Sequence, residues 1–277
     1  MKIIEDFLLS QGYSVTTQAS YRRLLSDLMT RGIDSLDASG LNTWLNRDTW
    51  GPSMRWQAYC AARSFIRWQY GEKHPAMSLK IKRVKSGPQR TLKESQIAML
   101  LASFDTTKVK GLRDLTACCL MLDTGLRLSE MCRLQVDYLD LPERALSVLI
   151  KGGGWDDRVY SLYTSTLLRQ WLGLRAELAQ CKEVFISLAG KRKGLGLTRD
   201  GFRVTVRRWG PAAGIGPITP HDFRRTFATQ SVRNGAPTRI VQVAGGWSNV
   251  EMVERYTRAL AADDCEPWLP VARIMSA

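Results

Sequence analysis

The sequence predicts a mainly α-helical protein that also contains a small β-sheet (α+β). Apolar residues recur at the three- and four-residue spacing of an amphipathic helix through most of the 277 residues. A basic segment with a Ser-Gly-Pro break interrupts this pattern at residues 79–90, and a β-rich stretch interrupts it again at residues 145–163. We therefore expect a small helical domain at residues 1–83, a basic linker at 84–91, and a mainly helical domain with a small sheet at 92–277.

The first domain is expected to hold about four short helices. Helical spacing is clear in the segments IIEDFLLS, ASYRRLLSDLMTRG, SGLNTWLNRD and MRWQAYCAARSFIRWQYG. Glycine and proline residues separate these segments, as is typical of helix ends. The hydrophobic content of 44% and the nine Trp residues are ample for a packed core.

The second domain begins with another amphipathic helix, which starts at Thr91 or at Lys93-Glu94. A hydrophobic helix, RDLTACCLMLDTG, then ends at Gly125, because glycine is a common C-terminal stop. Residues 145–163 contain two β-rich runs around three glycines and predict a hairpin. Four or five further helices follow.

The charge balance favours a nucleic acid partner. Lys and Arg number 40 against 26 Asp and Glu, which gives a net charge of +14 and a pI near 9.8. Residues 1–90 contain 14 basic and 7 acidic side chains and the remainder contains 26 and 19, so both parts are equally basic. This even split predicts that both domains face the same polyanion. The linker cations are candidate DNA contacts, with a solvated charged loop as the alternative, and they are Lys80, Lys82, Arg83, Lys85 and Arg90.

The cysteines and the hydropathy pattern predict a cytoplasmic, nucleoid-associated protein. The six cysteines form neither a CxxC pair nor a regular framework, and Cys118 and Cys119 lie in an apolar run, so we expect reduced core thiols. The N-terminus is too short and too acidic for a signal peptide, and the longest apolar run, LTACCLML, cannot span a bilayer. Neither export nor membrane insertion is expected.

The stretch TPHDFRRTFATQ, residues 219–230, predicts a helix with a polar functional face. Thr219 is a good N-cap, and Pro220 suits the first helical position. Helical spacing places His221, Arg224 and Arg225 on one face and the phenylalanines on the other. A solvated polar face is the alternative, and the spacing alone does not choose between Arg224 and Arg225.

Two other segments carry related signals. DTGLRLSEMCRL places Arg127 just after the Gly125 stop, with Glu130 one turn further on. GGWSNVEMVERYTR places Tyr256 in a helix, at the edge of an apolar stripe and nine residues beyond Trp247. These segments, in this order, resemble the tyrosine recombinase (phage integrase) family through most of residues 91–258.

The resemblance implies a role for each matching residue. It implies paired arginines on the scissile phosphate, a lysine general acid, supporting hydrogen-bond donors, an orienting carboxylate and a tyrosine nucleophile. In that order the residues are Arg127 and Arg224, Lys151, His221 and Trp247, Glu130, and Tyr256. It also implies a core-DNA-binding role for the first domain, a homotetramer on double-stranded DNA, and a C-terminal tail that docks on a neighbouring protomer, with packing of the tail on its own protomer as the alternative.

The sequence departs from the family pattern at three positions. Trp247 stands where many members have His, and its indole N–H can donate a hydrogen bond but cannot shuttle a proton. Phe223 replaces a Leu, and Gly245 replaces a Leu before the Gly-Trp pair. These changes leave the expected chemistry intact and affect local packing.

This residue set predicts strand transfer without a metal, a cofactor or ATP. Two arginine forks can stabilise the charge that develops on an attacked phosphodiester, and a phosphotyrosyl bond conserves the energy of the broken bond. The resemblance further implies a 3′-phosphotyrosyl intermediate and exchange through a Holliday junction, in integration, excision or resolution. The sequence points to no particular target site or accessory protein.

Other readings of the sequence remain open. The protein could be a metal-dependent nuclease, a type IB topoisomerase-like enzyme that relaxes DNA, or a non-catalytic DNA-binding protein of the same fold. The pair Asp156-Asp157 could suggest a metal site, although an acidic hairpin turn fits better. The cations of KRKGLG either contact phosphate or are merely solvated, and they are Lys191, Arg192 and Lys193.

Overall fold

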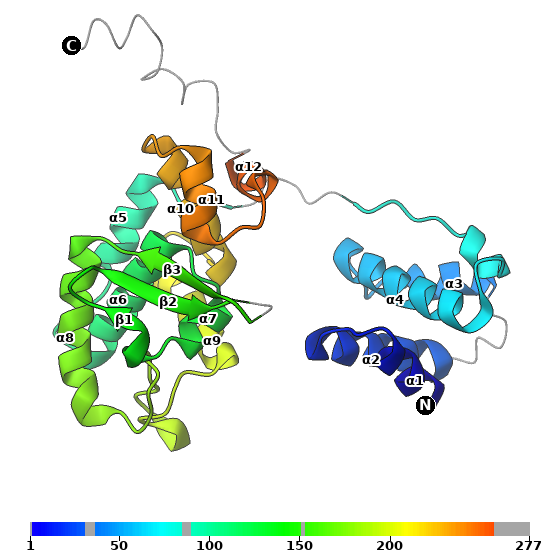
Figure 1. The fold of residues 1–277 in the computed structure, drawn as a ribbon, viewed down its shortest axis with the longest axis horizontal. Coiled ribbons are helices and arrows are strands. Elements are labelled where there is room, and N and C mark those ends of the chain that lie inside the picture. The colour runs from blue at the N-terminus through cyan, green and yellow to red at the C-terminus, as the bar shows by residue number, and fades with distance from the viewer. Residues whose placement is uncertain (1, 31–36, 85–89, 151–152, 258–277) are drawn as a thin grey trace, which may run out of the picture. The chain divides into compact units, whose positions relative to one another are not determined.

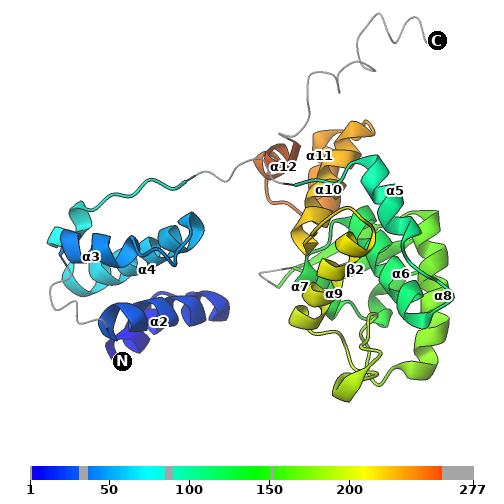
Figure 2. The same cartoon turned by 180° about the vertical axis from the view of Figure 1, so that it is seen from behind.

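The computed structural model describes residues 2–30, 37–84, 90–150 and 153–257. Its contacts divide the chain into two compact units, Met1–Gly87 and Pro88–Ala277 (Figures 1 and 2). Each unit has its own hydrophobic core. The structure is mainly helical and carries one small sheet, so the predicted fold class is confirmed.

Within residues 2–30 and 37–84, unit 1 contains the four helices that the sequence predicted. They are α1 (Lys2–Ser10), α2 (Val15–Thr30), α3 (Ala38–Leu45) and α4 (Pro52–Tyr70), followed by the 3-10 helix η1 (Pro75–Ser78). The longest, α4, has Pro52 in its first turn and ends at Gly71, whose φ is +82°. Its buried face includes Phe65, whose ring meets the ring of Phe7 in α1 edge to face.

Two side chains of α4 hold the chain that leaves unit 1. The Tyr59 hydroxyl donates to the carbonyl of Leu79 at 3.0 Å, and Arg63 Nη1 donates to the carbonyl of Met77 at 3.0 Å. The following cations Lys80, Lys82 and Arg83 are exposed. The basic segment therefore begins directly after an anchored turn.

Unit 2 contains a sheet and a larger set of helices. In chain order its elements are α5 (Glu94–Ala102), α6 (Val109–Thr124), α7 (Leu128–Arg133), η2 (Val136–Tyr138), β1 (Leu139–Asp140), β2 (Ala145–Leu149), β3 (Trp155–Val159), α8 (Leu162–Leu178), η3 (Gly190–Arg192), α9 (Arg199–Ala212), α10 (Pro220–Arg233), α11 (Thr238–Gly245) and α12 (Val250–Thr257). The described strands are antiparallel in the order β1-β2-β3. The predicted hairpin is confirmed, and five α-helices follow it within residues 153–257.

One expectation about the hairpin is wrong. Asp156 and Asp157 lie inside β3, where they pair with Val148 and Ser147 of β2, and not in the turn. Asp157 accepts a hydrogen bond from the Ser147 hydroxyl at 2.6 Å. The turn falls earlier in the chain because the strand already begins at Trp155.

The core of unit 2 is built around α6. Helices α8 and α10 pack against it, and the sheet lies over it (Figure 1). Nearly every residue of α6 after Gly111 is buried, including Cys118 and Cys119. Phe223 of α10 is fully buried here, with its ring 5.9 Å from that of Trp209, so the core accommodates phenylalanine at this position.

A smaller apolar cluster lies between α10, α11 and α12. It consists of the buried residues Phe227, Ala228, Val241, Trp247 and Val253. Figure 2 shows these three helices side by side at one end of unit 2. This cluster positions the residues that the sequence singled out.

Of the predicted core thiols, Cys118 and Cys119 are buried, whereas Cys60, Cys132 and Cys181 are partly buried and Cys265 lies outside the described residues. Cys60, Cys118, Cys119, Cys132 and Cys181 are free. Burial raises the pKa of Cys119 to about 12 and that of Cys132 to about 11, so both remain protonated at neutral pH. In the part of the chain that the structure describes, no helix combines the length and apolar character needed to cross a lipid bilayer.

Candidate active site

Arg127 lies at the junction of α6 and α7. Helix α6 ends at Gly125, whose φ of +60° is a left-handed conformation that favours glycine, and Arg127 is the N-cap of α7. The carboxylate of Glu130 accepts from the Arg127 backbone N–H at 2.8 Å and from Arg127 Nη1 at 2.7 Å. The Glu130 side chain is 5% exposed and that of Arg127 is 43% exposed. Glu130 therefore orients Arg127 from within the protein and leaves its outer edge accessible.

Helix α10 begins where the sequence predicted, and Asp222 completes its cap. Thr219 is the N-cap and Pro220 is the first helical residue. The Asp222 carboxylate accepts from both the backbone N–H and the hydroxyl of Thr219, each at 2.8 Å. Arg225 Nη1 donates to the same carboxylate at 3.0 Å. Asp222 and Arg225 are therefore engaged with the helix end.

Arg224 is held in a different way from its neighbour Arg225. Its side chain is almost fully buried, and Nη1 donates to the carbonyl of Gly125 at 2.6 Å. Nη2 donates to the carbonyl of Gly245 at 2.7 Å. These bonds connect the end of α6 to the end of α11. A guanidinium has five N–H donors, so the others remain available to an anion.

Trp247 covers one face of this guanidinium. The chain leaves α11 through Gly246, whose φ is +60°, and the Trp247 ring then lies 4.2 Å from Arg224 Cζ. The ring of Phe227 is nearly parallel to it, with centroids 6.1 Å apart. The indole is 5% exposed, and Nε1 has no hydrogen-bond partner among the described residues. A buried donor of this kind is costly unless a ligand supplies the acceptor.

Tyr256 lies beside Trp247 and His221. The Tyr256 ring centroid is 5.5 Å from that of Trp247 and 5.9 Å from that of His221. The Thr229 hydroxyl of α10 donates to the Tyr256 backbone carbonyl at 2.9 Å, which fastens α12 to α10. Tyr256 is half-buried and His221 is exposed, so a substrate can reach both.

The cations in this cluster affect one another. Burial and, after it, the neighbouring Arg127 charge lower the pKa of Arg224 to about 10, so Arg224 stays protonated at neutral pH. Loss of hydration lowers the pKa of His221, as do the charges of Arg225 and Arg224. His221 is therefore neutral at pH 7 and presents one donor and one acceptor nitrogen. The site is cationic and suited to an anion.

The structure brings together Arg127, Glu130, His221, Arg224, Trp247 and Tyr256. Lys151 and Lys85 lie outside the described residues. Arg90 donates to the carbonyls of Ile215 and Pro217, so its guanidinium is engaged within unit 2.

The loop cations lie elsewhere. Lys191, Arg192 and Lys193 are exposed, at the end of unit 2 opposite α11 and α12 (Figure 1).

The sequence reasoning missed Arg158. This side chain is 2% exposed, and its Nη2 donates to Asp156 at 2.7 Å. It packs against Gly246, where an added Cβ would lie 2.0 Å from Arg158 Nη2. A signal was present, because Asp156 and Arg158 occupy alternate positions of a strand whose other residues are exposed. Opposite charges on the inner face of a strand indicate a buried ion pair.

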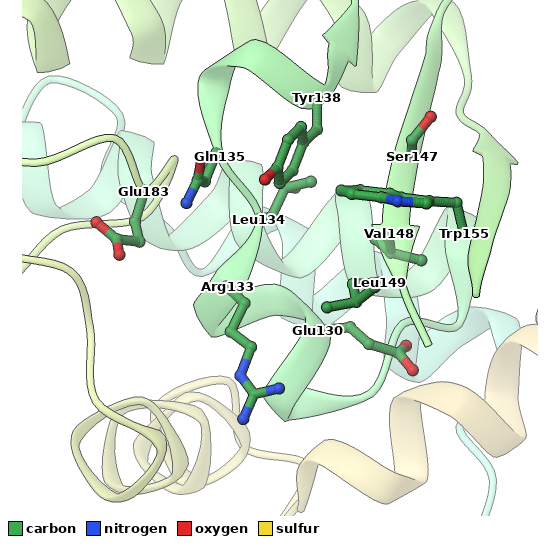
Figure 3. Close-up of a pocket in the computed structure, with 10 residues that line it drawn as sticks. All are labelled: Glu130, Arg133, Leu134, Gln135, Tyr138, Ser147, Val148, Leu149, Trp155 and Glu183. Atoms are coloured by element: carbon green, nitrogen blue, oxygen red, sulfur yellow. The ribbon is translucent and has the colours of Figure 1, made fainter. Parts of the chain in front are cut away.

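A separate hollow lies next to the cluster and is lined mainly by β2, β3 and the chain after α7 (Figure 3). Its cavity volume is about 210 Å³, and the rings of Tyr138 and Trp155 meet edge to face in it. Of its ten lining residues only Glu130 belongs to the cluster. The hollow is therefore distinct from the candidate phosphate site.

The described residues offer no metal centre. Within residues 2–30, 37–84, 90–150 and 153–257, no three His, Cys, Asp or Glu side chains lie close enough together to hold a metal ion. Asp156, which raised this question, is paired with Arg158.

Known proteins resemble this chain over nearly its whole length. Tyrosine recombinase XerD of Neisseria meningitidis serogroup B (strain ATCC BAA-335 / MC58) is 28% identical over 278 residues, covering 92% of this chain and 91% of the relative. The structure of the Tn1549 transposon integrase in complex with transposon right end DNA has a TM-score of 0.76 at 18% identity, covering 100% of this chain and 99% of that one.

A lambda integrase tetramer bound to a Holliday junction has a TM-score of 0.72 at 16% identity, covering 94% of this chain and 77% of that one. The sequence profile of the Phage integrase family matches residues 90–262, which is more than half of the chain and includes every residue of the cluster. The chain therefore belongs to the phage integrase family of tyrosine recombinases.

Proposed function

We propose that this protein is a site-specific DNA recombinase that cuts and rejoins DNA strands through Tyr256. The observation that carries this proposal is the buried, unpartnered indole N–H of Trp247, which lies against the Arg224 guanidinium and beside the Tyr256 ring. A donor, a cation and a phenol gathered in this way suit a phosphodiester under attack. Binding alone would not require the phenol.

Arg127 and Arg224 would hold the scissile phosphate. Each can offer paired N–H donors to nonbridging oxygens, and Trp247 Nε1 and His221 would supply further donors. At an effective dielectric of about 20, one charge at about 4 Å from the phosphate contributes roughly 4 kcal/mol before desolvation. Both arginines are held by protein acceptors, Glu130 for one and glycine carbonyls for the other, so little reorganisation is needed when charge develops.

Tyr256 would be the nucleophile. Its phenol oxygen attacks phosphorus as the phenol loses its proton, and the bond to the 5′-oxygen breaks. The products are a 3′-phosphotyrosyl bond and a free 5′-hydroxyl. Attack by a 5′-hydroxyl from a partner strand reverses these steps and regenerates the phenol. One phosphodiester replaces another, so no ATP is needed, and the two arginine cations would take the place of a metal ion.

Lys151 would protonate the leaving 5′-oxygen as general acid. In the sequence it lies between β2, which ends at Leu149, and β3, which begins at Trp155. The Ile150 carbonyl accepts from the Gly153 backbone N–H at 3.2 Å, and β3 packs against α11, with Arg158 against Gly246.

Each unit would contribute to DNA binding. We assign residues 1–83 to a core-DNA-binding domain, 84–91 to the linker, and 92–277 to the catalytic domain. The exposed cations Lys80, Lys82 and Arg83 would contact backbone phosphates, which position a protein on DNA without reading its sequence.

The active assembly would be a homotetramer on two DNA sites. Strands would be exchanged in pairs through a Holliday junction, the substrate on which the lambda integrase tetramer was solved. The apolar residues of the tail 262–277 would dock on a neighbouring protomer. Removal of this tail should abolish cooperative assembly on DNA, as measured by mobility shift, while leaving binding of one protomer intact.

The decisive experiment uses a nicked duplex substrate in EDTA. Purified protein is mixed with a library of candidate sites and analysed for an SDS-resistant protein–DNA adduct, beside Tyr256→Phe. The proposal expects an adduct with the wild type and none with the variant. Tight, salt-sensitive binding without any adduct would instead favour a non-catalytic DNA-binding protein, and relaxation of supercoils without joining of two sites would favour a topoisomerase.

A further inference from the structure

Gly245 lies under the Trp247 ring. A Cβ atom on Gly245 would lie 1.8 Å from Cζ3, 2.3 Å from Cε3 and 2.5 Å from Cη2 of Trp247. All three atoms belong to the six-membered ring of the indole. The indole therefore occupies the space that a side chain at position 245 would need.

The backbone does not explain this glycine. Gly245 is the last residue of α11, and its φ lies outside the left-handed region. Any residue could adopt this conformation, and alanine would favour the helix. The close approach of Trp247 is the reason that the position requires glycine.

The Trp247 ring has little space into which it could move away from a side chain at position 245. It contacts the Arg224 guanidinium, whose Cζ is 4.2 Å from the ring centroid, and the nearly parallel ring of Phe227. Phe227 in turn approaches Gly125, where an added Cβ would lie 2.6 Å from Phe227 Cδ1. Two glycines thus enclose a pair of stacked rings.

The same two glycines hold Arg224. Their carbonyls are the acceptors of its Nη1 and Nη2 donors. A shift of α11 that made room for a side chain at 245 would also move one of these acceptors. The contact between Gly245 and Trp247 therefore affects two groups of the cluster, the Arg224 cation and the Trp247 donor.

We propose that Gly245 is a positioning residue matched to tryptophan at 247, so that a side chain at 245 is compatible only with a smaller ring there. This inference rests on the proposed strand-transfer function for its kinetic readout. Histidine is the informative substitution because imidazole lacks the six-membered ring and with it all three clashing atoms. Gly245→Ala should therefore damage the wild-type site and leave a Trp247→His site nearly as it was.

The test is a double-mutant cycle of four proteins: wild type, Gly245→Ala, Trp247→His and the double variant. The rate of covalent adduct formation is measured at saturating nicked DNA, and DNA affinity is measured separately. In the tryptophan background, Gly245→Ala should slow adduct formation about 10- to 100-fold without weakening DNA binding. In the histidine background the same change should alter the rate less than about threefold, a coupling of at least about 0.7 kcal/mol at 1.4 kcal/mol per tenfold.

Gly173→Ala is the matched control. Gly173 is an exposed glycine inside α8 whose added Cβ would meet nothing within 4 Å, so this change should leave the adduct rate unaltered. A mild Gly245→Ala effect in the wild type, or an equal loss in both backgrounds, would refute the matching of these two residues.

Folding provides an independent readout. If Gly245→Ala destabilises the protein, the Trp247→His change should reduce that loss, as measured by urea denaturation of the full chain. Equal destabilisation in both backgrounds would count against the proposal. If no DNA yields an adduct with the wild type, the proposed function fails, whereas coupling in the denaturation experiment would still support the Gly245–Trp247 pairing.

Discussion

Replacement of Arg224 by lysine tests whether its fork is required in addition to its charge. Arg224 bridges two carbonyls that belong to different helices, with Nη1 at 2.6 Å from Gly125 and Nη2 at 2.7 Å from Gly245. A lysine ammonium is a single point at the end of a flexible stem and cannot keep both bonds while facing a phosphate. At least one charged hydrogen bond is lost, and one buried carbonyl is left without its donor.

The expected magnitude follows from that one bond. A hydrogen bond to a charged group contributes about 1.5–3 kcal/mol to stability. The free energy of unfolding of Arg224→Lys should fall by about this amount, as measured by urea denaturation. If the same bond positions the charge on the phosphate, the rate of adduct formation should fall roughly 10- to 150-fold, since about 1.4 kcal/mol corresponds to a factor of ten.

Arg225→Lys is the control, because it makes the same chemical change one residue away. Arg225 Nη1 donates to Asp222 at 3.0 Å, and the two side chains are 15% and 7% exposed. A lysine keeps the charge and can keep this single bond to one carboxylate, so both stability and adduct rate should stay closer to the wild type than in Arg224→Lys. Equal losses in the two variants, or a wild-type rate for Arg224→Lys, would refute the role given to the bridge.

Three further predictions follow from the same geometry. Glu130→Gln removes the buried carboxylate that orients Arg127. Adduct formation at saturating DNA should slow about tenfold, which corresponds to about 1.4 kcal/mol of transition-state stabilisation, with little change in DNA affinity. An unchanged rate would contradict an orienting role. The pKa of His221 is lowered from 6.5, mainly by loss of hydration, so the unfolded chain binds a proton at this residue more readily than the folded chain does. As the pH drops below 6.5, the free energy of unfolding of the wild type should therefore fall relative to that of His221→Asn. Parallel pH profiles of the two proteins would contradict this. Thr229→Val deletes the hydroxyl that donates to the Tyr256 backbone carbonyl. The free energy of unfolding should fall by about 1 kcal/mol, and the rate of adduct formation should fall as well. A variant with wild-type values in both assays would show that this bond does not position the nucleophile.

Local sequence patterns predicted the elements of the fold well. The left-handed stop at Gly125, the Thr219-Pro220 helix start and the glycine-rich hairpin all depend on short-range backbone preferences, which the sequence displays directly. The placement of Asp156 inside a strand was missed because the position of a turn within a glycine-rich segment depends on the register of the partner strand.

The selection of site residues depended on contacts that no local pattern reveals. Helical spacing could not separate Arg224 from Arg225, since the difference lies in acceptors at positions 125 and 245, far away in the chain. In the sequence, Gly245 stood out only as a departure from the family pattern. A glycine is required there because the ring of Trp247, two residues later, folds back over it. The pairing of Arg158 with Asp156 had a local signal in the strand, but the contact of Arg158 with Gly246, after α11, had none.

The two hydrogen bonds that Arg224 makes also bear on when the proposed activity can appear during folding. Its two bonds span 99 and 21 residues of the chain, so they form only after α6, α10 and α11 have docked. In the proposed mechanism, a partly folded chain would contain Tyr256 but would lack the assembled Arg224 site. Such a chain would not cut DNA before the native fold of unit 2 is complete.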